Sequence, residues 1–506
     1  MFVRKKQNKS GSISIQIINK SSGKYKVIET IGSSKQKGKI DFFIKQAHYR
    51  ISEIIGQKEL ELLTSDDRKI LEFLENNRTI GVRVTGPEDI LGRIFDSIGF
   101  NQIKDELFRY LVITRLVYPV SKLKTIDYLQ RYNNIEIDKD EIYRFLDKLN
   151  KRYKTQLEQI AFEHTAKILQ KKIAVVFYDI TTLYFEASSE DDLRKLGFSK
   201  DGKAQNPQIL LGLLVGQMGY PIGYDIFEGN KYEGKTLMPT IEKYVKRFNI
   251  TKPIIIADAG LLSKENIEKL EENHYQYILG GRIKNERQEV KEKILALSLS
   301  DGALAEIKNA NGSRLIVSYS SKRARKDESN RKRGLQRLEK IIASKKITKK
   351  QINNRGYNKY LKLRGNLTVE IDYQKYEQDG KWDGLKGYLT NSKLSAEKVI
   401  ENYGELWQIE KAFRISKTDL RIRPIYHRLK ERIEAHISIA FAAYTVYKEI
   451  ERMIQIKRLP LTAKRIIELT ETIYTLDFVL PESKQKKSVL LNLSEEQKLI
   501  YKIIPH

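Results

Sequence analysis

Two short runs of almost uninterrupted apolar residues constrain the fold of this chain more than any other feature. They span residues 173–178 and 253–257, and each is followed directly by an aspartate, Asp179 or Asp258. A strand that is apolar at successive positions is buried on both faces, as in the centre of an α/β sheet. Because ligands of open α/β sheets lie at the carboxyl ends of strands, both carboxylates are candidate site residues. Taken singly, each aspartate is also a common turn residue or helix cap.

The residues around these runs predict a mixed sheet covered by helices. Further strands are expected at 209–215, 220–227 and 275–279, and helices at 237–248 and 263–273. Gln217-Met-Gly separates the first two of these strands and is typical of a hairpin turn. The resulting order, β-β-β-α-β-α-β, predicts an α/β core with a mixed sheet.

A chain of 506 residues is too long for one compact core, and its hydrophobic pattern changes several times. Alternating apolar and polar residues at the start predict strands, and apolar residues three to four positions apart then predict helices. Later, β-like pieces flank a very basic helix expected over 321–350. We expect a small β-hairpin module at 1–38, a helical, DNA-binding region at 39–170, the core at 171–295, a basic β-rich and helical insertion at 296–382, the rest of the core at 383–455, and an α/β tail at 456–506.

The charge of the chain points to a polyanionic partner. Lys and Arg number 93 against 65 Asp and Glu, which gives a formal charge of +28. Such a surplus favours nucleic acid as the partner, with a solvated basic surface as the alternative. Short helices predicted over 106–117, 121–132 and 138–151 suit a helix-turn-helix element, although an ordinary helical bundle has the same pattern. The basic helix is a second candidate for contact with a DNA backbone, or is simply solvated.

Several classes of protein are excluded by composition. The chain has no Cys, which excludes disulfides, thiolate zinc sites and cysteine nucleophiles. Its six histidines form no metal-ligand spacing, and His436 is expected to pack in the core. The longest apolar windows, 209–216 and 435–447, fall short of the ~20 residues that span a bilayer. With no apolar stretch after the basic amino terminus, we expect a cytoplasmic protein without a membrane span.

A third carboxylate lies in a helix predicted over about 395–416. Spacings of 3, 4, 3 and 4 place five residues on one face of that helix, namely Tyr403, Leu406, Glu410, Phe413 and Lys417. Since a solvent-facing Glu usually lies opposite the apolar stripe, Glu410 is expected to point toward a site. A buried Glu that is satisfied by Lys or Tyr partners is the alternative.

Three carboxylates of this kind suit metal-dependent phosphoryl transfer. Magnesium prefers carboxylate and phosphate oxygens, and two such ions can activate the attacking oxygen and stabilise the leaving one. We therefore expect two Mg²⁺ ions, with Mn²⁺ as a substitute, on Asp179, Asp258 and Glu410. Lys417 is expected to bind a phosphate, and Tyr403 to stack on or hydrogen-bond to the nucleic acid.

At this point the chain resembles a known family. The order strand-Asp, strand-Asp, basic insertion, helix-Glu, together with Tyr403-x2-Leu406-x3-Glu410-x6-Lys417, resembles the Tyr-Arg-Glu-Lys signature of bacterial insertion-sequence DDE transposases. It is most similar to the insertion sequence four superfamily, whose catalytic domain is RNase H-like. Segments Phe227-Glu-Gly-Asn, Ile256-Ala-Asp258-Ala-Gly and Asp383-Gly-x2-Gly-Tyr-Leu-Thr-Asn also look like that family, and the resemblance covers about residues 171–451.

The resemblance implies a DNA transposase that cuts the ends of its element and then directs a 3′-hydroxyl against target DNA. It implies double-stranded DNA as partner, both terminal inverted repeats and target, a homodimer on that DNA, and association with the nucleoid. Leu406 stands where the signature has Arg, so the contact made by that Arg comes from Arg414 or is absent. Lys235 is a further residue expected to contact DNA.

A competing motif supports other functions. Gly229-Asn-Lys-Tyr-Glu-Gly-Lys235-Thr236 satisfies the P-loop pattern, and Asp258 then takes the place of the magnesium-binding Asp of an ATPase that acts on nucleic acid. Against this, the preceding strand is expected to be one arm of a hairpin, and the loop is bulky and carries a carboxylate where a triphosphate would lie. A non-catalytic DNA-binding protein is the third alternative.

Overall fold

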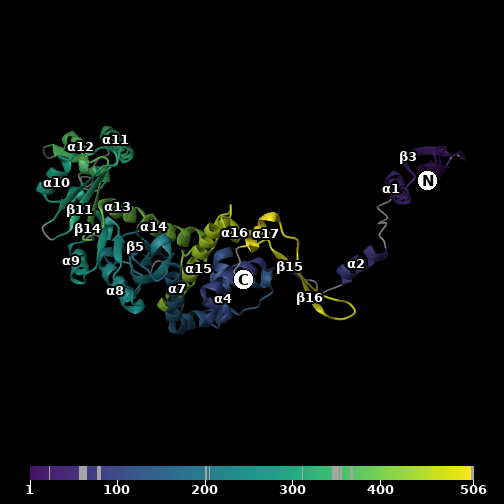
Figure 1. The fold of residues 1–506 in the computed structure, drawn as a ribbon, viewed down its shortest axis with the longest axis horizontal. Coiled ribbons are helices and arrows are strands. Elements are labelled where there is room, and N and C mark those ends of the chain that lie inside the picture. The colour runs from purple at the N-terminus through teal and green to yellow at the C-terminus, as the bar shows by residue number, and fades with distance from the viewer. Residues whose placement is uncertain are drawn as a thin grey trace. The chain divides into compact units, whose positions relative to one another are not determined.

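The computed structural model describes most of the chain. It covers residues 1–21, 23–55, 65–76, 81–187, 189–199, 202–203, 205–261, 263–309, 312–344, 353, 356–364 and 368–502. These residues form two compact units, and Figure 1 shows their elements. Unit 1 comprises Met1–Val82 and Leu476–Val489, and unit 2 comprises Arg83–Thr475 and Leu490–His506.

Unit 1 begins with three antiparallel strands, β1 (Phe2–Gln7), β2 (Ile13–Asn19) and β3 (Lys26–Ser34), where the sequence predicted a hairpin. The additional strand forms because residues 2–7 pair with residues 13–18 along their full length. Helix α1 (Lys37–Ile55) packs on this sheet through Ile40 and Ala47, which join Ile15 and Ile17 in a small core. Helix α2 (Ser65–Asn76) and strand β16 (Lys486–Leu490) follow, and strands β4 (Gly81–Val84) and β15 (Tyr474–Val479) straddle the division between the units.

Unit 2 is built on an eight-stranded mixed sheet in the order β10-β11-β14-β9-β8-β5-β6-β7. Its central strands are β5 (Val175–Tyr184), β6 (Gln208–Val215), β7 (Pro221–Glu228), β8 (Ile254–Ala257) and β9 (Tyr277–Gly281). Strands β5, β6 and β7 are antiparallel, whereas β5, β8 and β9 are parallel. The predicted α/β fold with the order β-β-β-α-β-α-β is therefore confirmed.

Helices cover both faces of this sheet, as Figure 1 shows. Helices α8 (Leu237–Phe248) and α9 (Lys264–Glu272) share one core with alternate residues of the central strands, such as Val176 and Ile255. On the other face, α13 (Ala396–Gly404), α14 (Trp407–Arg414) and the long α15 (Lys430–Lys457) pack against the intervening strand residues. Each central strand is thus buried on both sides, which explains its apolar run.

The helical region predicted between 39 and 170 is divided between the units, and its larger part belongs to unit 2. This part contains η1 (Pro87–Gly92), α3 (Arg93–Ile98), α4 (Glu106–Val117), α5 (Lys122–Asn133), α6 (Lys139–Lys148), η3 (Leu149–Tyr153) and α7 (Lys154–Ile168). The three helices predicted over 106–117, 121–132 and 138–151 correspond to α4, α5 and α6, each of which starts at a capping Asp or Ser. Helices α4 and α6 pack against α15, and α5 packs against α6, so that these helices and the sheet share one hydrophobic core.

The region predicted as an insertion starts within the main sheet. Strands β10 (Leu304–Lys308) and β11 (Arg314–Tyr319) pair with each other and with β14 (Leu385–Thr390) at one edge. They join the sheet because β14 still offers a free hydrogen-bonding edge on the side away from β9. The basic helix α11 spans Ser321–Ala343, and residues 345–350 of the predicted helix lie outside the described residues. A small hairpin, β12 (Leu361–Arg364) with β13 (Thr368–Ile371), and α12 (Tyr373–Gly380) follow.

The end of the chain contains α16 (Ala463–Thr470) and α17 (Glu495–Tyr501). Ser494 and Gln497 form a capping box at the start of α17, because each side chain bonds to the backbone N–H of the other residue. Buried His436 packs in α15 as expected, with Nε2 2.9 Å from the carbonyl oxygen of Ile422. Among the described helices, none combines the length and apolar character that crossing a membrane requires.

Candidate active site

The register of the parallel strands places Asp179 and Asp258 at the same level of the sheet. Tyr178 of β5 is the partner of Ala257 of β8, and the next residue on each strand is the aspartate. Asp258 directly follows β8, as predicted. Asp179 lies within β5 instead of at its end, because β5 continues to Tyr184 by antiparallel pairing with β6. The prediction that both strands stop at the aspartate is therefore correct for one strand only.

Both aspartates lie on the sheet face that α14 covers. Phe177 and Ile256 belong to the core that contains the α14 and α15 side chains, and successive strand residues alternate between faces. Asp179 and Asp258 are each two residues further on and so share that face. Asp179 is half-buried, whereas Asp258 is exposed at the end of its strand.

Glu410 lies in α14, which packs against β5 and β6. The continuous helix predicted over 395–416 is wrong: α13 ends at Gly404 and α14 begins at Trp407. The chain tightens between them, where the Leu406 N–H donates to the carbonyl of Tyr403 at 3.0 Å, a three-residue bond that closes the end of a helix. A π-helical turn, η10 (Ile415–Asp419), then follows α14.

The residues of the predicted face differ in their exposure. Tyr403, Leu406 and Phe413 are buried, as the apolar stripe predicted, but Glu410 is exposed. It shares the exposed side of α14 with Trp407 and Arg414, which lie one turn before and after it. The alternative of a buried Glu410 is therefore wrong, and Glu410 is exposed while it still acts on the Tyr403 hydroxyl. The carboxylate is open to a ligand that approaches from solvent.

Two contacts hold α14 over the sheet. The tip of the β6–β7 hairpin lies beneath it, where Gly219 adopts φ +76° and Tyr444 of α15 donates a 2.7 Å hydrogen bond to the Gly219 carbonyl. A side chain at this glycine would meet Gln408 of α14 at 3.3 Å. In addition, Lys411 of α14 forms a 2.6 Å ion pair with Glu451 of α15. The hairpin and α15 thereby fix the helix that carries Glu410.

Tyr403 connects the strand carboxylates to the helix. Its hydroxyl donates a 3.1 Å hydrogen bond to Oδ1 of Asp258. The ring packs edge-on against Tyr388 at 5.0 Å, and Lys386 Nζ lies 4.5 Å from the centre of the Tyr403 ring. Gly280 of β9 makes room for this arrangement, because a Cβ there would lie 2.6 Å from the Tyr403 hydroxyl.

The charges of Asp258 and Glu410 act on the same two neighbouring side chains, Tyr403 and Lys386. Burial raises the pKa of the Tyr403 hydroxyl, and the negative charges of Asp258 and Glu410 raise it further. Burial and the neighbouring Arg323 lower the pKa of Lys386, and the same two carboxylates partly oppose that effect. The pKa values of Tyr403 and Lys386 therefore both depend on the charges of Asp258 and Glu410.

The donor set has the chemistry that a divalent cation requires. Asp179, Asp258 and Glu410 supply hard oxygen ligands from one side of the sheet, and two of the three are exposed. Among the described residues, no group of three or more His, Cys, Asp or Glu side chains lies close enough together to hold an ion. The backbone thus brings the three carboxylates to one region, while their side chains are not gathered around one point.

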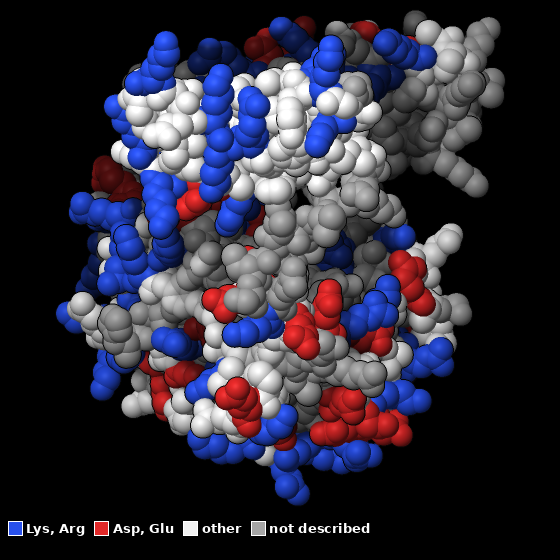
Figure 2. Space-filling view, turned by 90° about the vertical axis from the view of Figure 1, so that its right-hand side faces the viewer, with Lys and Arg blue, Asp and Glu red and all other residues white. Residues whose placement is uncertain are grey.

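The residues predicted to bind DNA lie around this region. Lys235 is exposed in η5 (Glu233–Lys235), which packs beside η6 (Ala259–Leu261), the turn that directly follows Asp258. Arg414 is exposed at the end of α14, and Lys417 lies in the π-helical turn that follows. Figure 2 draws the right-hand side of the view in Figure 1, and Lys and Arg side chains are exposed at many points on that face.

The P-loop alternative lacks its structural context. Residues 229–236 follow β7, which is an edge strand antiparallel to β6, whereas a P-loop follows a parallel core strand. The loop leads through the short turn η5 into α8 without a side-chain cap at Thr236. The structure therefore assigns this segment to the surroundings of Asp258.

Lys386 and Tyr388 are the site residues that the sequence analysis missed. Both belong to β14 and lie against Tyr403, beside two of the carboxylates. The sequence did contain a pointer, since both fall within the segment from Asp383 to Asn391 that carried part of the resemblance. Their roles escaped notice because only the sheet order places β14 next to β9.

The fold and site define a class: an α/β protein with acidic residues on adjacent parallel strands and a third on the covering helix. The family model described as Transposase DDE domain matches residues 170–446, more than half of the chain, and the chain belongs to this family. It is thus a DDE transposase that acts on DNA, a class that generally depends on divalent metal ions.

Other comparisons add little. One solved structure, the "Cryo-EM structure of piggyBac transposase synaptic complex with hairpin DNA (SNHP)", is 11% identical, with 76% of each chain covered and a TM-score of 0.38. A search of curated proteins found no match.

Proposed function

We propose that this chain is an insertion-sequence transposase of the insertion sequence four superfamily, in which Asp179, Asp258 and Glu410 form the catalytic acidic triad. One observation carries the assignment: the first two residues lie level on adjacent parallel strands, under the helix that bears the third. The family match supports the class, and the spacing from Tyr403 to Lys417 supports the branch.

The reaction consists of two phosphoryl transfers. In the first, water attacks a phosphodiester at an element end, so that one P–O bond forms and one breaks, leaving a 3′-hydroxyl. In the second, that hydroxyl attacks a target phosphodiester and a target 3′-oxygen leaves with a proton. Two bound Mg²⁺ ions, with Mn²⁺ as a substitute, would activate the attacking oxygen and stabilise the leaving one. Neither step requires a nucleotide cofactor.

The side chains of this chain supply ligands, orientation and charge. Asp179, Asp258 and Glu410 would hold the ions, and the Tyr403 hydroxyl fixes the carboxylate of Asp258 by its 3.1 Å hydrogen bond. Lys386 contributes positive charge beside the same carboxylates.

Basic side chains near the triad are proposed to contact the phosphates of the DNA. Arg414 is exposed one turn beyond Glu410, while Leu406 at the signature Arg position is buried. We assign the missing Arg contact to Arg414, and further backbone contacts to Lys417 and Lys235.

The DNA partners follow from the same proposal. The substrates are the terminal inverted repeats of the element and a target duplex, and a homodimer on DNA would bring two ends together. The helices between 39 and 170 are proposed to contribute to end binding, since α4, α5 and α6 are short helices with tight breaks.

The decisive test is the variant Asp179→Asn, measured by Mg²⁺-dependent nicking of DNA that carries the element ends. Loss of one metal ligand should slow nicking by roughly 10³-fold, because metal-ion catalysis contributes several kcal/mol to the transition state. Duplex binding in EDTA should be retained, since that step needs no bound ion.

Asp225→Asn is the matched control. Asp225 lies in the same sheet on β7, but its carboxylate pairs with Lys243 of α8 on the opposite face. This variant should nick at the wild-type rate. Wild-type nicking by Asp179→Asn would overturn the assignment, and a protein that binds the ends but never nicks them would be a non-catalytic DNA-binding protein.

A further inference from the structure

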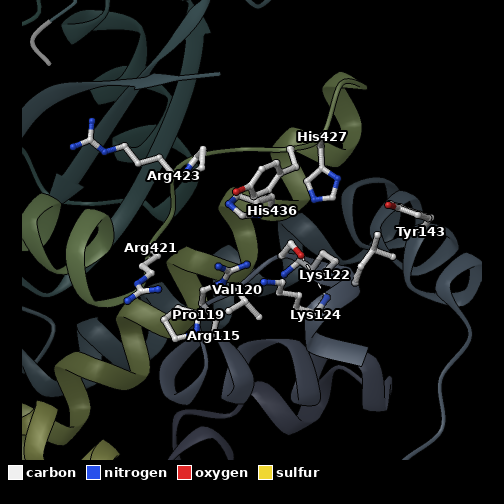
Figure 3. A pocket seen from close by; sticks show the side chains of 14 residues that line it. Arg115, Pro119, Val120, Lys122, Lys124, Tyr143, Arg421, Arg423, His427 and His436 are labelled. Atoms are coloured by element: carbon white, nitrogen blue, oxygen red, sulfur yellow. Dashed lines mark hydrogen bonds between the residues drawn. The ribbon is translucent and has the colours of Figure 1, made fainter. Parts of the chain in front are cut away.

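A second site lies in unit 2, away from the three carboxylates. It is a pocket of about 430 Å³ between the end of α4, the first turn of α5, the start of α15 and the segment that follows η10 (Figure 3). Its basic lining residues include Arg115, Lys122, Lys124, Arg421, His427 and His436. No Asp or Glu is among the described residues that line it. The pocket is therefore strongly positive.

Two of these cations are buried without a counter-ion. Arg115 is 4% exposed and Lys122 is 6% exposed. Within the described part of the chain, neither is paired with a carboxylate, and Nε of Arg115 has no hydrogen-bond partner. Burial lowers the pKa of Arg115 to about 10, and burial together with the charge of Arg115 lowers that of Lys122 well below its usual value.

The other buried cations of the described chain are treated differently. Arg194 is 6% exposed and forms a 2.6 Å ion pair with Asp191, and Lys448 is 6% exposed and forms a 2.6 Å ion pair with Glu451. Burying a charge costs free energy unless an opposite charge lies beside it. Arg194 and Lys448 each have such a carboxylate partner. Arg115 and Lys122 depart from this rule, and both face the same pocket.

The geometry of the pocket suits a phosphate oxyanion. The first turn of α5 lines it, and Ser121 caps that turn by accepting a hydrogen bond from the Lys124 N–H at 3.4 Å. The amino end of a helix favours an anion, and a guanidinium donates to two phosphate oxygens at once. In Figure 3, Arg115 and Lys122 approach from one side, and His427 and His436 from the other.

The pocket is also connected to the catalytic core. Arg421 belongs to the segment that leaves the π-helical turn after α14, the helix of Glu410. Two residues later, Arg423 lies 5.4 Å from the ring centre of Tyr184, on the strand that carries Asp179. A ligand in the pocket would thus contact a segment that touches both catalytic elements.

We propose that this pocket binds a phosphate of the DNA backbone through Arg115 and Lys122, and so anchors the bound duplex at a point outside the acidic triad. The inference rests on DNA as the substrate of this family. A free phosphate ion has the same chemistry, and the experiment separates these two sources.

The test uses the full-length variant Lys122→Met, which removes the buried charge and keeps the volume. Binding of a fluorescent duplex is measured in EDTA at several salt concentrations. We expect the Kd to rise about tenfold and the slope of log K against log salt to fall by about 1, because one phosphate contact is lost. Arg131→Met is the control: Arg131 is exposed at the far end of α5 and outside the pocket lining, so its variant should bind as the wild type does.

Thermal unfolding supplies the second arm. Without a ligand, Lys122→Met should have a higher Tm than the wild type, since an unpaired buried charge is gone, whereas a purely structural lysine would give a lower one. Inorganic phosphate at constant ionic strength should stabilise the wild type more than the variant. Should phosphate do so while Lys122→Met keeps its DNA affinity and salt slope, the site belongs to a free ion and the proposal fails. It fails equally if neither DNA nor phosphate distinguishes the two proteins.

Two further variants keep the outcome clear. Lys124→Gln changes an exposed lining cation, so that a folding defect is not expected, and it should weaken binding in the same direction by a few-fold. Asp179→Asn should bind the duplex normally and lose nicking. A failure of the phosphate pocket would therefore leave the acidic triad untouched, and the reverse also holds.

Discussion

The acidic site and the basic pocket of unit 2 differ in the sign of their charged side chains and in how far these side chains are buried. In the acidic site, Asp258 and Glu410 are exposed, and Asp258 accepts a hydrogen bond from Tyr403. In the basic pocket, Arg115 and Lys122 are buried and have no carboxylate partner within the described chain. One group of charges is open to solvent, and the other is enclosed.

This difference matches two roles toward a phosphodiester, namely cleaving it and binding it. Carboxylates repel a phosphate unless a cation lies between them, so a site built on carboxylates stays accessible to metal ions and to the scissile strand. Buried cations attract a phosphate directly, and their strength grows as water is excluded. Under the two proposals made above, charge sign and burial together distinguish the site that cuts DNA from the site that holds it.

The largest expected effect comes from Glu410→Gln, which removes one charge from the open site and keeps the shape of the side chain. Nicking in Mg²⁺ should fall by roughly 10³-fold, because the helix then offers an amide in place of a carboxylate ligand. Glu405→Gln, an exposed change just before α14, is the control and should nick normally. If Glu410→Gln retained full activity, Glu410 would not be a catalytic residue, and the acidic site would not be the site that cuts DNA.

A smaller effect is expected from Tyr403→Phe. The variant loses only the hydroxyl that bonds Asp258, and a hydrogen bond to a carboxylate contributes about 1.5–3 kcal/mol at most. Nicking should fall about tenfold at limiting Mg²⁺ and recover in part at saturating Mg²⁺, since Tyr403 orients a ligand. A metal titration checks this, and an equal loss at every Mg²⁺ concentration would indicate a purely structural role.

The smallest effect concerns the pH dependence of the enclosed region. Burial, together with the positive charges of Lys122, Arg432 and Arg115, lowers the pKa of His427 from 6.5 to about 4. The rings of Tyr143 and His436 also face it. The unfolded chain takes up this proton near pH 6.5 and the folded chain only near pH 4, so stability is lost as the pH falls through that window.

His427→Gln should therefore flatten the decline of Tm between pH 6.5 and pH 4. His48→Gln, at an exposed position of α1, should leave the decline unchanged. Burial and the positive charges of Arg115 and Lys122 also lower the pKa of His436, so part of the slope remains in the variant. An unchanged slope in His427→Gln would show that the pocket does not resist protonation of this ring.

The sequence predicted much of the fold because burial leaves a direct trace in residue order. Apolar runs marked β5 and β8, and the position of Asp258 after its strand was correct. The helix around Glu410 was predicted as continuous, since its spacing fits one face, but it is interrupted between Gly404 and Trp407, and Glu410 is exposed. A local spacing rule does not reveal where a helix is interrupted by its packing against a sheet.

The sequence by itself determined the order of strands and helices in the core from β5 to β9, the absence of cysteine chemistry, the excess of positive charge and the identity of three candidate carboxylates. It could do so because hydrophobic periodicity and composition are local properties of the chain. Only the tertiary structure decided that Asp179 and Asp258 lie level on one face, and that Lys386 stands beside Tyr403.

The tertiary structure alone also places Lys122 beside Arg115 and in the same pocket as His427. His427 lies hundreds of residues further along the chain. Whether a lysine is solvated or buried without a partner depends on what other segments pack around it. That property belongs to the folded protein and has no trace in its neighbours along the sequence.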